Sequence, residues 1–176
     1  TCGDINHADV TIKGRRSAQE IGILLSDSVE QGLQQLTTVK QPSLAVKSAV
    51  LSAPVQNYTA EQIDAARKAM DSVADSKVPF LKRVEAYKIS AIQLRGVQAI
   101  TLEVQAFRLG PDLAIVTLPG EIFVELGMAT KQASPFKTTL VIELANDALG
   151  YIPTQKAFVE GSYETVNSRV QPGNGE

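Results

Sequence analysis

The sequence has little of two residue types on which whole classes of proteins depend. Its 176 residues include one cysteine, Cys2, so an internal disulfide is impossible and the redox compartment cannot be read from cysteine usage. The single histidine, His7, sharply limits any metal site or histidine-based catalytic triad built from this chain alone. A chain of this length can bury most of its apolar surface, so it needs neither disulfides nor metal merely to fold.

Charge and apolar runs exclude two further classes. Seventeen basic and nineteen acidic residues leave a net charge of −2, and no basic block marks a nucleic-acid-binding surface. No apolar run approaches the length of a transmembrane span, and no signal peptide is visible. We therefore expect one globular domain over residues 1–176. Its abrupt ends suggest a fragment truncated at both ends, or a processed piece, of a protein that is either secreted or cytoplasmic.

Two capping boxes and one proline predict where helices begin. Ser17 and Thr59 are each followed three residues later by Glu or Gln, the pattern in which side chains and backbone amides cap one another. Pro79 suits the first turn of a third helix, where a missing amide costs nothing. With the apolar spacing that follows, the predicted helices are 18–36, 60–75 and 79–96.

Strand patterns complete the expected fold class, which is α/β, with helices packed on a mixed β-sheet. Turn residues 109–112 join two strands into a hairpin. The apolar run 113–118 is typical of a central strand buried on both faces, and 139–145 is predicted to be another buried strand. The predicted strands are 44–53, 98–108, 113–118, 139–145 and 163–170, with helices after residue 121 and over 155–160, and a mobile tail at 173–175.

The stretch from Leu113 to Thr154 is the most informative for function. Pro119-Gly120-Glu121 is an abrupt turn between a strand and a helix, and Tyr151 follows the next strand. Ligand sites in open α/β sheets gather at the ends of such strands, so we expect Glu121 and Tyr151 to share a site. The alternatives are that Glu121 only stabilises the positive first turn of the helix and that Tyr151 only packs.

The N-terminal segment offers further candidates. Gly3-Asp4-Ile5-Asn6-His7 is polar and led by glycine, as suits a loop that lines a site, although a lone histidine is more often structural. A free N-terminal threonine can act as a nucleophile with its own amine as base, so Thr1 is a further alternative.

Three segments of the chain resemble the neutral/alkaline (non-lysosomal) ceramidase family. Residues 3–7 resemble its Gly-Asp-Val-Ser-Pro-Asn loop, and Leu118-Pro119-Gly120-Glu121 resembles its Pro-Gly-Glu turn. Residues 150–154, followed by 157–158 and 161–164, resemble its Tyr-Val-Thr-Thr…Glu-Tyr…Tyr-Glu segment. The three motifs come in the family's order and approximate spacing.

This resemblance implies a zinc-dependent hydrolase that cleaves the amide of ceramide or of a related N-acyl substrate. The family's zinc is held by two histidines, a glutamate and a tyrosine; the last two correspond to Glu121 and Tyr151. The two histidines are expected outside this chain, before Thr1, in an N-terminal part of the same domain that would be its partner.

Two departures from the family pattern affect the expected chemistry. Asn6 stands where the family has its catalytic serine, and His7 stands where it has proline. Asp4, Asn6 and His7 are therefore the candidate catalytic residues, with Asn6 or His7 able to donate a hydrogen bond to an oxyanion. The alternative function is a non-catalytic binding or structural domain that keeps the fold without the metal.

Overall fold

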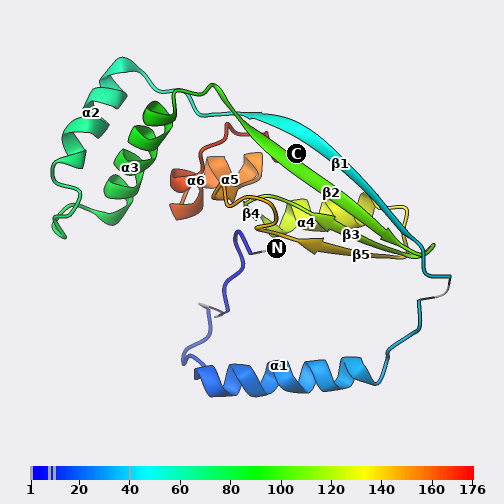
Figure 1. The fold of residues 1–176 in the computed structure, drawn as a ribbon. Helices are drawn as coiled ribbons and strands as arrows, with labels where there is room; N and C mark the ends of the chain where they lie inside the picture. The colour runs from blue at the N-terminus through cyan, green and yellow to red at the C-terminus, as the bar shows by residue number, and fades with distance from the viewer. Residues whose placement is uncertain (1, 8, 10, 40) are drawn as a thin grey trace.

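A mixed four-stranded sheet forms the centre of the computed structural model, which describes residues 2–7, 9, 11–39 and 41–176 (Figure 1). Its strand order is β1-β2-β3-β5, with β1–β2 and β2–β3 antiparallel and β3–β5 parallel. The predicted hairpin and the α/β class with a mixed sheet are confirmed. The strands are β1 (Leu44–Pro54), β2 (Ala99–Leu109), β3 (Leu113–Thr117) and β5 (Thr138–Ile142).

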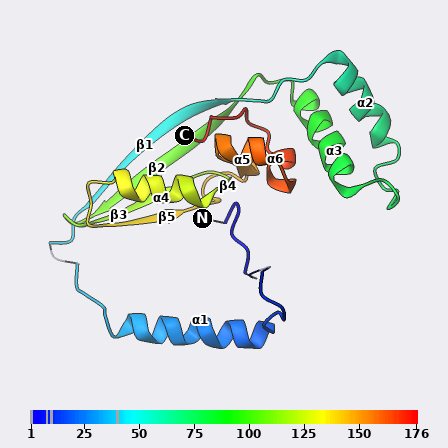
Figure 2. The ribbon, with the colours of Figure 1, turned by 180° about the vertical axis from the view of Figure 1, so that it is seen from behind.

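Helices surround the sheet unevenly. Figure 1 shows α2 and α3 paired at one end of the long β1–β2 ribbon, with α5 and α6 beside them, and Figure 2 shows α4 lying along one face of the sheet. Two short strands, β4 (Glu121–Ile122) and β6 (Tyr151–Ile152), pair with each other apart from the main sheet. The helices are α1 (Ala18–Leu33), α2 (Ala60–Met70), α3 (Phe80–Arg95), α4 (Val124–Ala133), α5 (Gln155–Glu160) and α6 (Tyr163–Asn167).

The predicted helix starts are confirmed. Both capping boxes are complete, because the Ser17 and Thr59 side chains accept from the amides three residues on and those residues reciprocate. Gly96 follows α3 with a positive φ of 60°, the left-handed conformation that ends helices and that glycine adopts without strain. The helix after Thr59 ends at Met70, five residues earlier than predicted.

The sheet is covered on one face only, so the prediction of strands buried on both faces is wrong. Cross-strand partners Ala53 and Ile100 lie on the covered face and belong to the core. On the opposite face, Val46 is 50% exposed and both Leu140 and Ile142 are 47% exposed. An apolar run alone does not reveal how many faces of a strand are covered, since that depends on other elements.

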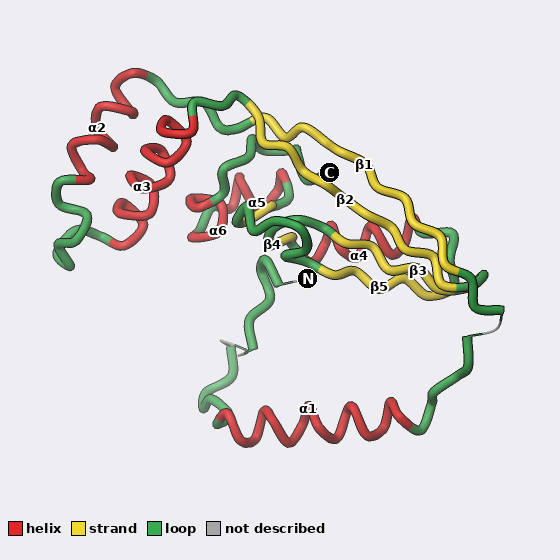
Figure 3. Tube along the Cα trace, in the orientation of Figure 1, coloured by secondary structure: helices red, strands yellow, loops and turns green. Residues whose placement is uncertain are grey.

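Helix α1 is amphipathic as predicted but has no buried residue. Figures 1 and 3 show it set apart from the sheet, between the N-terminal segment and the loop that leads to β1. Its apolar side chains include Leu24, Leu25 and Val29, which are between 47% and 65% exposed. Together with the uncovered face of the sheet, they give the described chain an unusual amount of exposed apolar surface.

Two predictions for the C-terminal region are wrong. Residues 163–170 do not form a strand: Tyr163–Asn167 is the helix α6, and Val170 makes an isolated bridge with Val55. The tail is also packed, because a Cβ on Gly175 would lie 2.8 Å from a Leu126 side-chain atom. Packing of the chain end against α4 and β6 is a tertiary effect that local composition does not report.

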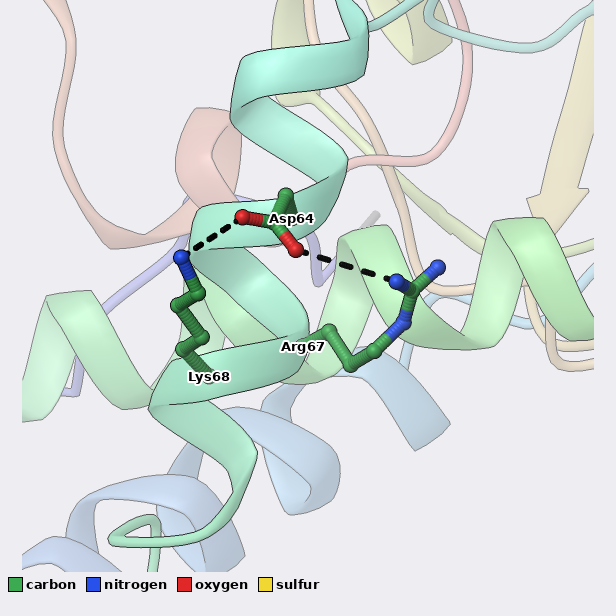
Figure 4. Close-up of polar contacts among 3 residues, drawn as sticks. All are labelled: Asp64, Arg67 and Lys68. Carbon is green, nitrogen blue, oxygen red and sulfur yellow. Dashed lines mark ion pairs between the residues drawn. The ribbon is translucent and has the colours of Figure 1, made fainter.

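The surface of α2 carries exposed ion pairs. Asp64 pairs with Lys68 at 2.8 Å and with Arg67 at 3.8 Å, one helical turn away (Figure 4). The basic side chains are about three-quarters exposed. Pairs of this kind are screened by water and contribute little to stability. None of the described helices is long and apolar enough to cross a membrane.

A buried lysine connects α3 to the end of β1. The Lys88 side chain is only 5% exposed, with its Nζ 3.3 Å from Gln56 Oε1 and 5.4 Å from the ring centre of Tyr58. Gln56 Oε1 also accepts from the Tyr58 hydroxyl. Removal of the ammonium from water lowers the pKa of Lys88 to about 8, against an upward effect of Glu85.

Lys88→Met should therefore stabilise the protein at pH 7, by about 1 kcal/mol once relaxation and water penetration are allowed for. The folded protein loses the Lys88 proton near pH 8, whereas the unfolded chain holds it to about 10.5. The unfolded state thus binds more protons across this window, and the wild-type free energy of unfolding should rise toward that of Lys88→Met as pH increases. Urea unfolding of both proteins at pH 7, 8.5 and 10 measures this difference.

Lys82→Met is the matched control, because Lys82 lies on the same helix with its side chain 72% exposed. It should change stability little and without this pH dependence. A Lys88→Met protein less stable than wild type at pH 7 would contradict the prediction.

Candidate functional site

The two predicted ligands are side by side, because β4 and β6 pair in parallel with Glu121 opposite Tyr151. The Glu121 amide donates to the Gly150 carbonyl at 2.9 Å, and the Phe123 amide donates to the Ile152 carbonyl at 3.2 Å. The prediction that Glu121 lies in the first turn of a helix is wrong: its backbone is committed to this pairing, and α4 begins at Val124. Both side chains are half-buried.

Gly120 makes this pairing possible. Its φ is +91°, and a Cβ built on it would lie 2.7 Å from the Gly150 carbonyl oxygen. Only glycine combines this conformation with so close a backbone approach. The Pro-Gly-Glu sequence therefore turns the chain so that Glu121 meets the neighbouring loop.

The environment keeps Tyr151 protonated. Burial raises the pKa of the phenol, and the Glu121 carboxylate raises it further by its charge and by accepting from the hydroxyl. Tyr163 and Glu164 of α6 act in the same direction. At neutral pH Tyr151 therefore carries its phenol proton opposite Glu121.

The N-terminal segment lies against β4, as the predicted site requires. The Gly3 amide donates to the Ile122 carbonyl at 3.1 Å, and a Cβ on Gly3 would be 2.7 Å from the Glu121 carbonyl oxygen. Asp4 Oδ1 accepts from the Val124 amide at 2.7 Å, at the start of α4. Asp4 is thus next to the site, and one of its oxygens stabilises the N-terminal end of this helix.

Glu143, which was not among the predicted site residues, joins the N-terminal segment to β4. Its Oε2 accepts from the Cys2 amide at 2.7 Å, from Cys2 Sγ at 3.0 Å and from the Ile122 amide at 3.0 Å. The available signal was a lone carboxylate at the end of the apolar run 139–145. The hydrogen bond to Glu143, burial and the charges of Glu143 and Glu121 raise the pKa of the Cys2 thiol to about 11.

Two residues near the C-terminus support Tyr151. The Tyr163 ring meets the Tyr151 ring edge-on, with centroids 5.6 Å apart and planes at 76°. The Arg169 guanidinium donates to the Leu149 carbonyl, two residues before Tyr151. In the sequence Tyr163 is only part of the 161–164 motif, and no pattern indicates a role for Arg169.

The other predicted site residues are not joined to this pair by any described contact. His7 is exposed and lines a cavity of about 150 Å³ with Asp9, Arg15 and Ile21, beside the start of α1. Asn6 is also exposed. Their predicted catalytic roles stay predictions, and the alternative nucleophile, Thr1, lies outside the described residues.

The donors present suit part of a metal site. Glu121 offers carboxylate oxygens and Tyr151 a phenol oxygen, which are oxygen donors of the kind that zinc accepts. Among the described residues, no group of three or more His, Cys, Asp or Glu side chains is placed to hold a metal ion. The pair therefore offers two oxygen donors, and a complete metal site would need further ligands.

Comparison with known proteins gives one distant likeness. No family model and no curated protein matches the sequence. Neutral ceramidase from Pseudomonas aeruginosa is a structural neighbour, with a TM-score of 0.49 and 16% sequence identity over 88% of this chain. The chain spans 29% of the length of that ceramidase chain. Neither a family nor an activity follows from a likeness of this size.

Glu143→Gln should activate the Cys2 thiol. The side-chain oxygen of the glutamine can still accept hydrogen bonds from the Ile122 and Cys2 backbone amides, but the negative charge is gone. The pKa of the Cys2 thiol should therefore fall from about 11 toward 9. The larger fraction of Cys2 present as thiolate outweighs the lower nucleophilicity of each thiolate. Alkylation by iodoacetamide at pH 8 should therefore become about tenfold faster. Glu160→Gln, which changes a 62% exposed carboxylate, is the control. An unchanged rate in Glu143→Gln would show that Glu143 does not control the thiol.

Proposed function

We propose that this chain contributes the glutamate and tyrosine of a zinc site in a ceramidase-like amide hydrolase. The observation that supports it is the in-register pairing of β4 with β6, which brings Glu121 and Tyr151 together at the mouth of the parallel β3–β5 pair. Two residues thirty positions apart in the sequence thus meet where α/β folds commonly bind ligands. The motif resemblance independently selects the same two side chains.

Each side chain has a defined part in this proposal. Glu121 presents a carboxylate fixed by its strand pairing, and Tyr151 presents a hydroxyl whose direction is fixed by Tyr163 and by the loop that Arg169 holds. Bound zinc would supply the acidity that makes a water nucleophilic at neutral pH and would polarise the amide carbonyl. Asn6 and His7 are proposed to donate to the oxyanion and Asp4 to hold the loop that carries them.

The proposal requires two histidines from an N-terminal part of the same domain. The exposed apolar surfaces support such a partner: the uncovered sheet face, with Val46 and Leu140, and the apolar side of α1, with Leu25, have nothing packed on them among the described residues. Contiguous apolar surface of this kind is typical of a face that another element covers.

A non-catalytic binding or structural domain is the second candidate. It is favoured because no group of three or more His, Cys, Asp or Glu side chains in the described part of the chain is placed to hold a metal ion. In this case the pairing of Glu121 with Tyr151 only joins two short strands.

Zinc content separates the two functions. In protein expressed from the complete gene, Glu121→Ala and Tyr151→Phe should each weaken zinc binding by more than about 100-fold, since even residues that only orient ligands contribute 10–100-fold. Tyr151→Phe keeps the ring that packs on Tyr163, so its effect reports the hydroxyl. Metal analysis after dialysis against a calibrated chelator gives the affinities.

Glu125→Gln is the control, because Glu125 lies one turn further on and is exposed at the start of α4. It should retain full zinc. Equal zinc content in wild type and both site variants would overturn the ligand assignment and leave the structural domain as the function.

The substrate class is tested separately. With zinc bound, the same protein should release fatty acid from a short-chain ceramide or from another N-acyl amide, and Glu121→Ala should lower the rate by at least about 100-fold. A measured release that is equal in wild type and Glu121→Ala would contradict hydrolysis at this site.

A further inference from the structure

We propose that Phe80, Arg83 and Tyr163 form a subsite that binds an anionic group on the substrate, next to the candidate metal ligands. The inference rests on the proposed function for the identity of the reacting amide, but the binding it describes needs no metal. It names a substrate class: amides that carry an apolar segment ending in a carboxylate or another anion.

The first step is a continuous aromatic path from the site to α3. Tyr151 contacts Tyr163 edge-on at 5.6 Å, and Tyr163 stacks on Phe80 at 5.5 Å with an interplanar angle of 26°. Asn167 donates to the Tyr163 hydroxyl at 3.2 Å and fixes that ring. The path joins three elements, β6, α6 and α3, and its first ring belongs to a proposed ligand.

The second step is the exposure at the far end of this path. Phe80 is 57% exposed although it begins a helix and stacks on another ring. An aromatic ring placed beside a polar site and left open to solvent offers apolar contact area at little entropic cost. The apolar segment of a ligand would lie against this ring.

The third step is an unpaired cation over the same ring. The Arg83 guanidinium lies 5.8 Å from the Phe80 centroid, and its Nε is buried without a hydrogen-bond partner. None of the described ion pairs includes Arg83; the nearby carboxylate of Glu85 is paired with Lys82 at 3.1 Å. The Arg83 side chain as a whole is half-buried, so its guanidinium can take an acceptor from a ligand in place of water.

An anion is the partner that this chemistry selects. Guanidinium presents a planar set of donors that matches a carboxylate or phosphate, and a hydrogen bond to a charged acceptor is stronger than one to a neutral group. Three contacts lead from Arg83 through Phe80 and Tyr163 to Tyr151, so the apolar segment of a ligand would lie along these rings with its anionic end at Arg83. A neutral lipid amide would leave Arg83 unpaired.

The test uses two probes of the same shape, 4-phenylbutyrate and 4-phenylbutyramide, with protein expressed from the complete gene and kept zinc-free by a chelator. Saturation-transfer NMR titration gives both dissociation constants. Wild type should bind the carboxylate about tenfold more tightly than the amide, because the bond to Arg83 is charge-assisted. Arg83→Met should remove the preference, Arg83→Lys should keep part of it, and Phe80→Ala should weaken both probes alike.

Lys82→Met is the matched control, since it removes an exposed cation one residue away and should leave the preference unchanged. Circular dichroism shows whether each variant is folded. The inference is overturned if wild type binds neither probe, binds both equally, or keeps its preference in Arg83→Met. None of these results depends on zinc, so a failed zinc assignment for Glu121 is distinguishable from a failed subsite.

Discussion

The parallel pairing of two residues in β4 with two in β6 is the constraint on which the candidate site depends. It exists because Gly120 brings its backbone against the Gly150 carbonyl, at a distance that leaves no room for a Cβ. Glu121 and Tyr151 are then held by main-chain hydrogen bonds and not by side-chain packing alone. A site built this way is supported by the backbone, which favours a fixed position for both oxygen donors.

Three further segments secure this pairing. The N-terminal residues pack on β4 through Gly3, the end of β5 contributes Glu143 as a shared acceptor, and the C-terminal segment contributes Tyr163 and Arg169. These segments come from the beginning, middle and end of the chain. Most of the non-local contacts near the site therefore serve to place two oxygen donors and a neighbouring aromatic path, while much of the sheet and all of α1 remain uncovered.

The sequence predicted those features whose cause is local. Capping boxes at Ser17 and Thr59 and the turn chemistry of 109–112 each act within a few residues, and each was confirmed. The sequence also predicted that Glu121 and Tyr151 lie close together, and the structure pairs them. It failed where tertiary contacts decide: Glu121 pairs as a strand because Gly150 is opposite it, residues 163–167 form a helix against α3, and β3 and β5 are covered on one face only. Glu143 and Arg169 were missed because their partners lie far away in the chain.

Protonation links the present contacts to the proposed metal. Tyr151 carries its phenol proton opposite Glu121, and zinc must displace this proton to use the phenol as a ligand, so binding should be weaker at low pH and should release a proton. The raised pKa of the phenol makes this displacement costly. Further ligands would be needed to overcome the cost. The same contact that holds the pair in place thus argues that this chain alone binds zinc weakly, and that strong binding depends on donors from outside it.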